Sequence, residues 1–193
     1  MKRFALILLL GGFSVGCSTI QAINMIPRDL SAQFPSEQNN NIRVDRVVAG
    51  KNIGSLQLES LAGDENRTFQ TALEKSLAQN QLFSPNGRYL LKTTFEEIEI
   101  PFVFSSSTVT TRVRYILIDQ SSGTPVMNEL IEASSTATFS DSFHGGKRMN
   151  IARKGSARES IGQLLIKLSQ LSSTSPPGYV PTESTTEEGE MMF

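Results

Sequence analysis

The chain has 193 residues, with 18 Lys and Arg against 19 Asp and Glu, one His, one Cys and no Trp. A single Cys excludes an intramolecular disulfide, and together with a single His it excludes the usual His and Cys zinc sites. The formal net charge of -1 gives no global reason to expect a nucleic-acid partner. Hydrophobic residues make up 38% and charged residues 19%, which is the composition of an ordinary globular domain.

The N-terminus has the pattern of an export signal. Lys2 and Arg3 precede the apolar run 4–10, and the small residue Gly16 precedes Cys17. The apolar run is too short to cross the roughly 30 Å of hydrocarbon in a bilayer. Residues 1–16 are therefore predicted to form a secretory signal peptide and not a transmembrane helix.

The Gly16-Cys17 junction resembles the lipobox of bacterial lipoproteins, although Ser14 stands where that family most often has Leu. The resemblance implies that Cys17 carries diacylglycerol and further acyl chains such as palmitate, and that the signal is cut just before it. Each buried acyl methylene contributes about 0.8 kcal/mol, so several chains give lasting attachment. Ser18, by resemblance to sorting in enteric bacteria, implies the periplasmic face of the outer membrane. The alternative for Cys17 is a buried, inert thiol.

Two segments flank the expected domain. Residues 17–41 contain Pro27, Pro35 and three consecutive Asn without a sustained period, and we expect a lipid anchor followed by a flexible tether. The alternative is a short helix packed on the domain, formed by Ile20, Ile23, Met25 and Ile26. Residues 172–193 are acidic and Pro-rich, which predicts a disordered tail.

The first half of the domain 42–171 predicts a strand and a helix. Residues 42–48 alternate as a strand that stops at Ala49 and Gly50, and a second short run, 54–58, is either a strand or an extended approach to the helix. The helix is expected from Asp64 to about Asn80, capped by Asp64 or Gly63. Its apolar stripe consists of Phe69, Ala72, Leu73, Ser76 and Leu77.

The second half predicts three long strands and a final helix. The strands are expected at 88–100, 108–118 and 125–139, with a turn at Ser105–Ser107 and a hairpin loop at 119–124. In the middle strand one face consists of Val109, Thr111, Val113, Tyr115 and Leu117. The last helix is expected at 150–171, with an apolar face made of Ile151, Ala157, Ile161, Leu164, Leu165, Leu168 and Leu171.

The predicted fold class is α+β. The order strand-helix-strand-strand-strand-helix packs most simply as two layers, with both helices on one face of a mixed four-stranded sheet. The first strand reaches the sheet through a crossover helix, which makes that pairing parallel.

This element order over residues 42–171, together with the Gly16-Cys17 junction, is similar to the family of the LPS-assembly lipoprotein. The resemblance implies a small outer-membrane lipoprotein that works with an envelope protein, as the family's best-known member does in the LPS translocon. Auxiliary lipoproteins of ABC-type lipid transporters use comparable layers, so that alternative stays open. Fold likeness alone transfers no binding residue.

Two groups of residues could in principle support catalysis. His144 lies in a Gly-rich connector, where we expect a solvated loop. Glu97 and Glu99 are expected on one face of their strand, with Glu96 on the other. Arg112 and Arg114 share a face of the next strand, so the charges are expected to form cross-strand pairs.

Two further groups are candidate contacts for a partner or a lipid. A basic group at the start of the last helix comprises Lys147, Arg148, Arg153, Lys154 and Arg158, and it either contacts anionic headgroups or is the polar face of the helix. Phe102 and Phe104 lie at a hairpin tip, where they either face a partner or close one end of the core.

The sequence therefore predicts a non-enzymatic outer-membrane lipoprotein, anchored at Cys17, that acts in the periplasm as a binding or assembly factor in cell-envelope biogenesis. Its expected partners are the membrane, through the N-terminal lipid, and an envelope protein, a lipid or LPS, with no metal, cofactor or nucleic acid. The alternatives are an auxiliary lipoprotein of a lipid transporter, and a periplasmic small-ligand binder or enzyme that uses Glu97, Glu99 and His144.

Overall fold

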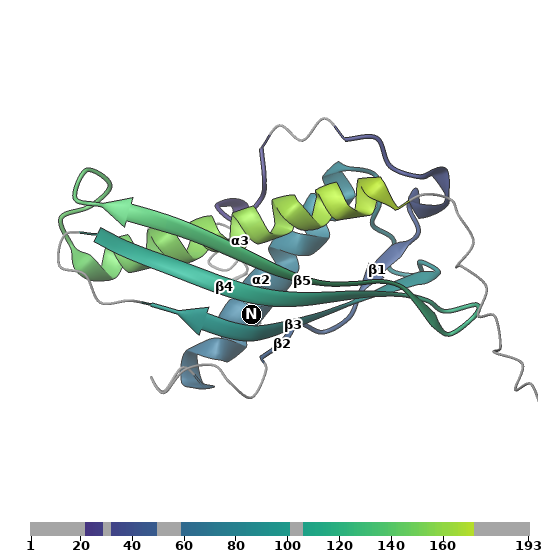
Figure 1. The fold of residues 1–193 in the computed structure, drawn as a ribbon, viewed down its shortest axis with the longest axis horizontal. Coiled ribbons are helices and arrows are strands. Elements are labelled where there is room, and N and C mark those ends of the chain that lie inside the picture. Colours follow the sequence, from purple (N-terminus) through teal and green to yellow (C-terminus); the bar gives the residue numbers. More distant parts are fainter. Residues whose placement is uncertain (1–21, 29–31, 50–58, 101–105, 172–193) are drawn as a thin grey trace, which may run out of the picture.

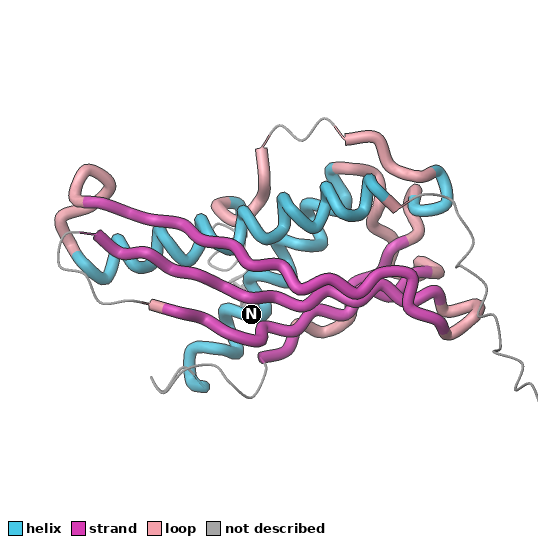
Figure 2. Tube along the Cα trace, viewed as in Figure 1, coloured by secondary structure: helices cyan, strands magenta, loops and turns pink. Residues whose placement is uncertain are grey.

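The computed structural model describes residues 22–28, 32–49, 59–100 and 106–171, and has an α+β fold with two long helices on one face of a mixed sheet (Figures 1 and 2). The helices are α2 (Glu59–Gln79) and α3 (Gly145–Gln170). The strands are β1 (Ile42–Val44), β2 (Val48–Ala49), β3 (Tyr89–Glu99), β4 (Ser106–Asp119) and β5 (Thr124–Thr138). The predicted fold class is confirmed.

The sheet has the order β1-β3-β4-β5, and β2 also pairs with β3. Both β1 and β2 run parallel to β3, as expected for strands that reach it through a crossover helix. The predicted first strand at 42–48 is thus two short strands, and the sheet has five strands instead of four. The pairings of β3 with β4 and of β4 with β5 are antiparallel.

The helix-facing side of β4 forms the centre of the core. Its predicted inward residues Val109, Thr111, Val113, Tyr115 and Leu117 are all buried, so the alternation is confirmed. Two polar pairs join this face to α3, from Tyr115 to Ser160 (2.8 Å between the oxygens) and from Thr111 to Ser156 (2.7 Å). Burial raises the pKa of Tyr115, so its hydroxyl stays neutral and hydrogen-bonded.

Helix α2 begins earlier than the sequence predicts. It starts at Glu59, so the expected caps Gly63 and Asp64 lie inside the helix, and that prediction is wrong. Residues 59–62 include Glu, Leu and Ala, which are good helix formers that offset the cost of about 1 kcal/mol for an internal Gly. The predicted apolar stripe is confirmed, since all five of its residues are buried, and Phe69 packs edge-on against Phe95.

Helix α3 packs very closely on β4 and β5. Small side chains face the sheet, and Ala152, Ser156, Ala157 and Ser160 are all buried. A Cβ atom added to Gly155 would lie only 2.7 Å from the Cβ of Ser135 on β5. The helix starts at Gly145 instead of residue 150, and Ile151, predicted on its apolar face, is exposed. Because the side of the helix with the small residues packs on the sheet, Ile151 lies on another side and faces away from the sheet.

Part of the expected tether is packed on the domain. Ala22 and Met25 are buried in the main core, and Ile26 and Phe34 pack against it. Gln38 donates a hydrogen bond from Nε2 to the backbone oxygen of Leu168 (3.2 Å). The prediction of a tether over 17–41 is therefore wrong for its described part, because these side chains supply apolar surface to the core.

Of the alternative, the packing of Met25 and Ile26 on the domain is confirmed, but both residues follow the helical turn at 22–23 and are not helical themselves. Ile23 in the same turn is exposed, and Ile20 lies outside the described residues. The signal peptide 1–16, the run 54–58, the apolar cluster 101–104 and the tail 172–193 also lie outside them. The expected turn at Ser105–Ser107 is wrong for its last two residues, which begin β4.

The loop between β4 and β5 is organised by Asp119. Its carboxylate accepts hydrogen bonds from Arg88 Nε (2.7 Å) and from the backbone nitrogen and hydroxyl of Ser121 (2.9 and 2.8 Å). Gly123, with a φ of 73°, donates its N–H to the Asp119 backbone oxygen (2.7 Å). The hydrogen bond from Arg88 is the main reason that the pKa of Asp119 lies well below its ordinary value.

The close contact of α3 with the sheet predicts that alanine substitutions at two glycines of that helix have different effects on stability. Gly155→Ala should lower the free energy of unfolding by about 1–3 kcal/mol, because the added methyl overpacks against Ser135. Gly162→Ala should leave it unchanged or raise it by up to about 1 kcal/mol, because a Cβ there meets nothing closer than Pro27 at 3.9 Å. Urea unfolding checks both, and equal effects would contradict the packing described.

The Asp119 site predicts a pH-dependent stability difference. Because the folded-state pKa is depressed, the ionised carboxylate stabilises the fold above the unfolded-state value of about 4, and this contribution declines as the pH falls below it. Asp119→Asn should therefore lower the melting temperature at pH 7, and the difference from wild type should shrink at acid pH. The control Glu159→Gln removes an exposed carboxylate, and its melting temperature should differ little from that of the wild type at either pH.

Candidate functional site

The sheet face opposite the helices carries the acidic residues singled out in the sequence. The register of β3 against β4 shifts between Phe95 and Glu97, so Glu96 is the extra residue of a β-bulge. The bulge places Glu96 and Glu97 on the same outward face and brings Ile98 back toward the core. The expectation that Glu96 points to the other face is wrong, because the bulge interrupts the period of two.

These carboxylates are paired with arginines from the neighbouring strand. Arg112 forms ion pairs with Glu97 and with Glu132 of β5, the latter at 2.7 Å, as the cross-strand expectation predicts for Arg112. Arg114 pairs with Glu96 and not with Glu99, again because of the bulge. The hydrogen bond that Arg112 donates to Glu132 is the main reason that the pKa of Arg112 is raised, and the one that Arg114 donates to Glu96 raises the pKa of Arg114. The outward charges thus largely neutralise one another.

The structure does not assemble His144 with the glutamates. His144 is exposed and is the residue before the first turn of α3, while Glu97 and Glu99 belong to β3, whose pairing places them on the open face. Among the residues that the structure describes, no group of three or more His, Cys, Asp or Glu side chains could hold a metal ion.

Arg148 has a structural role that the sequence did not suggest. It is buried, it donates hydrogen bonds from Nη1 to the backbone oxygens of Ser142 and Phe143 (both 3.0 Å), and its guanidinium lies 4.2 Å from the centre of the Phe139 ring. The prediction that Arg148 contacts a lipid or partner is therefore wrong. Its guanidinium binds groups of the segment that connects β5 to α3 and stabilises that connection.

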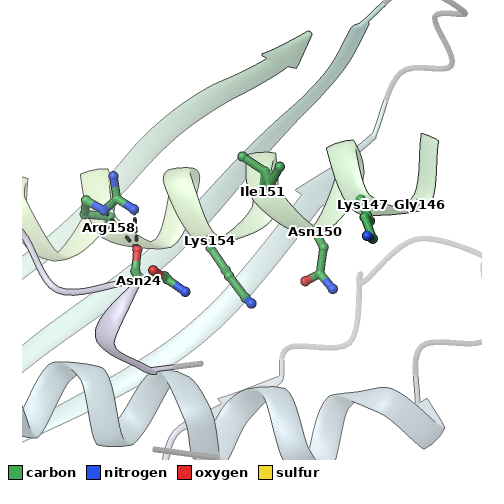
Figure 3. Close-up of a pocket in the computed structure, with 7 residues that line it drawn as sticks. All are labelled: Asn24, Gly146, Lys147, Asn150, Ile151, Lys154 and Arg158. Atoms are coloured by element: carbon green, nitrogen blue, oxygen red, sulfur yellow. Dashed lines mark hydrogen bonds between the residues drawn. The ribbon is translucent and has the colours of Figure 1, made fainter. Parts of the chain in front are cut away.

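Lys147, Lys154 and Arg158 of the basic group line a groove of about 530 Å³ beside α3 (Figure 3). Figure 3 shows Lys147, Asn150 and Lys154 projecting from the same side of the helix, with Asn24 next to Arg158. Arg158 donates a hydrogen bond from Nε to the backbone oxygen of Asn24 (2.9 Å), which fixes the N-terminal segment against the helix. The lining residues are Asn24, Gly146, Lys147, Asn150, Ile151, Lys154 and Arg158.

The groove is basic, and we call it the α3 groove. Three of its seven lining residues are cationic and none is acidic. Lys147 and Lys154 form no ion pair with any residue in the described part of the chain. Arg153, the other residue predicted as a contact, is half-buried on α3 and does not line the groove.

The sequence did not identify every residue of the α3 groove. Positions 147, 151, 154 and 158 are spaced by four, three and four residues, which is one side of a helix and could have been recognised. Asn24 could not have been, because only its packing brings it to α3. Phe102, Phe104 and Cys17 lie outside the described residues.

A second groove, of about 410 Å³, lies between α2 and the link from β1 to β2. Its charges are mixed, and it is lined by Arg46, Val47, Asn66, Arg67, Gln70, Thr71 and Glu74. Gln70 is already hydrogen-bonded to Glu74 (2.9 Å). Neither α2 nor α3, the long helices of the described residues, is sufficiently apolar over the length needed to cross a membrane.

No protein-family model matches the sequence, and no curated protein matches it. Solved structures do share its fold. Protein XCC0632 from Xanthomonas campestris, of the DUF330 family, is 11% identical with a TM-score of 0.56, and the match covers 74% of this chain and 90% of that protein. The hypothetical protein CT253 from Chlamydia trachomatis is 10% identical with a TM-score of 0.50, covering 69% and 97%.

A minor lipoprotein from Acinetobacter baumannii is also similar, at 9% identity and a TM-score of 0.43, with 64% of this chain and 90% of that protein covered. At such low identities these likenesses concern the fold and not the function.

The contrast between two adjacent basic residues predicts different effects on stability. Arg148→Ala should lower the free energy of unfolding by about 2–3 kcal/mol, because it leaves two backbone oxygens without a charged donor and removes the guanidinium that lies over the ring of Phe139. Lys147→Ala, at an exposed position, should change it by no more than about 0.5 kcal/mol. Chemical denaturation measures both, and a small effect of Arg148→Ala would contradict its structural role.

Proposed function

We propose that this chain is an exported bacterial lipoprotein, anchored through Cys17 at the periplasmic face of the outer membrane, that acts as a non-enzymatic binding or assembly factor in the cell envelope. The observation that carries the proposal is the sequence of the N-terminus. A basic and apolar leader ends in Gly16 followed by Cys17, the single Cys of the chain.

The packing of the N-terminal segment supports an anchoring role for Cys17. Ala22, which is completely buried, follows Cys17 by only five positions. Five residues span at most about 18 Å even when fully extended. A lipid on Cys17 would therefore keep the folded domain close to the membrane surface.

The charges of the described residues support a non-enzymatic role. The carboxylates that are best placed to act together, Glu96 and Glu97, are each held by an arginine on the neighbouring strand. A general acid or base needs a group that can exchange a proton with a substrate, whereas Glu96 is paired with Arg114 and Glu97 with Arg112 within the sheet.

A role in LPS assembly is the finer part of the proposal. Its support is the order of elements over residues 42–171, which resembles that of the LPS-assembly lipoprotein family. The partner would then be an envelope protein or LPS itself, met at the membrane to which Cys17 holds the domain.

Replacement of the lipid-bearing residue tests this function. In cells, Cys17→Ser should abolish acylation of the mature N-terminus, as read by mass spectrometry, and move the protein from the membrane fraction to the soluble fraction. Globomycin should cause the unprocessed form of the wild-type chain to accumulate. In cells that lack the gene, the wild-type chain should restore resistance to detergents and large antibiotics, and Cys17→Ser should not.

The neighbouring variant Ser18→Ala is the matched control, because it keeps the cysteine and should remain acylated and membrane-bound. A mature wild-type chain with an unmodified Cys17 would refute the anchor. Full restoration of resistance by Cys17→Ser would refute the need for membrane attachment.

A further inference from the structure

The α3 groove has the charge of an anion site. Lys147, Lys154 and Arg158 line it, and the amides of Asn24 and Asn150 supply neutral hydrogen-bonding groups beside them. Glu159, the nearest carboxylate along α3, accepts a hydrogen bond from Gln163 and does not line the groove. Ammonium and guanidinium groups in such a cluster suit the oxygens of a phosphate.

The α3 groove has an apolar residue beside its cations. Ile151, which lines it, is 43% exposed, and Ile23, which precedes the lining residue Asn24 in the sequence, is 55% exposed. Cations next to exposed aliphatic side chains are typical of a surface that lies in the headgroup layer, where phosphates and the first acyl carbons meet.

The chain places this groove near its own point of attachment. Asn24 lines the groove and follows Cys17 by seven positions, which span at most about 25 Å when fully extended. Arg158 binds the backbone oxygen of Asn24, so the N-terminal turn and the groove move together. Whichever way the domain turns on its anchor, the α3 groove stays close to the membrane surface.

From the charge, the apolar residue beside the cations and the position, we infer that the α3 groove binds the phosphate groups of anionic phospholipids in the membrane that holds Cys17. This inference rests on the proposed lipid anchor. Lys147 and Lys154 hold the phosphate, Arg158 joins the groove to the N-terminal turn, and Ile151 enters the headgroup layer. The bound headgroups would fix the orientation of the domain, with α3 toward the membrane and the open sheet face directed away from the site of attachment.

The lack of Trp in the chain allows a direct test. The acylated mature protein carrying Ile151→Trp is reconstituted into vesicles of phosphatidylcholine alone, or of phosphatidylcholine with phosphatidylglycerol. The emission of the new indole should shift to the blue when phosphatidylglycerol is present, and the shift should be lost at about 1 M salt, where charges are screened within about 3 Å. The matched reporter Leu130→Trp, on the open sheet face and 43% exposed, should show no such shift.

The cations are tested in the same background. Lys147→Gln combined with Lys154→Gln should abolish the phosphatidylglycerol-dependent shift of the Ile151→Trp protein. The charge-matched control Lys92→Gln with Lys167→Gln, both outside the α3 groove, should retain it. Equal emission in both kinds of vesicle, or a shift that survives loss of Lys147 and Lys154, would overturn the inference.

Two further measurements separate the causes of a failure. Flotation with vesicles of phosphatidylcholine alone reports the lipid anchor, so a protein that floats but shows no shift refutes the α3 groove and not the anchor. A protein that fails to float refutes the anchor. Inorganic phosphate should cause no shift, and the same shift with inorganic phosphate as with vesicles would identify a soluble anion and overturn the membrane assignment.

Discussion

The close approach of α3 to the sheet is the constraint on which the rest of the structure depends. At Gly155 the helix leaves no room for a side chain against Ser135, and small residues on both sides of that position keep the contact short. Once this side of the helix faces the sheet, the side with Lys147, Ile151 and Lys154 must face outward. The N-terminal turn is joined to the outward side of the helix by the hydrogen bond from Arg158 to Asn24. The orientation of α3 on the sheet therefore determines both which residues enter the core and which line the α3 groove.

The two charged surfaces of the domain differ in how their charges are balanced. On the open sheet face, the bulge at Glu96 places that carboxylate beside Arg114, and Arg112 forms ion pairs with two carboxylates. The opposite charges of this surface therefore pair with one another. The residues that line the α3 groove include three cations and no acidic residue. Exposed ion pairs contribute little to stability and also little attraction for a ligand, whereas unbalanced cations attract anions over about a Debye length.

Local patterns in the sequence predicted the elements, and contacts between distant residues account for what was missed. The alternation from Val109 to Leu117 and the stripe from Phe69 to Leu77 are repeated patterns, and both were right. The packing of the N-terminal segment entered only as an alternative, and its bond from Gln38 to Leu168 was not predicted because it joins positions 130 residues apart. The bulge at Glu96 and the buried position of Arg148 were missed because each depends on a neighbour that the local sequence does not identify.

The contact between the N-terminal segment and α3 also sets the order in which the molecule can be completed. A chain is made from its N-terminus, so residues 22–28 and 32–41 exist before the helix α3 on which Asn24 and Gln38 pack. Gln38 cannot bond to Leu168 until the end of α3 has been made, and this contact closes a loop of 130 residues. The segment nearest the proposed anchor is thus held by a helix from the opposite end of the domain's sequence.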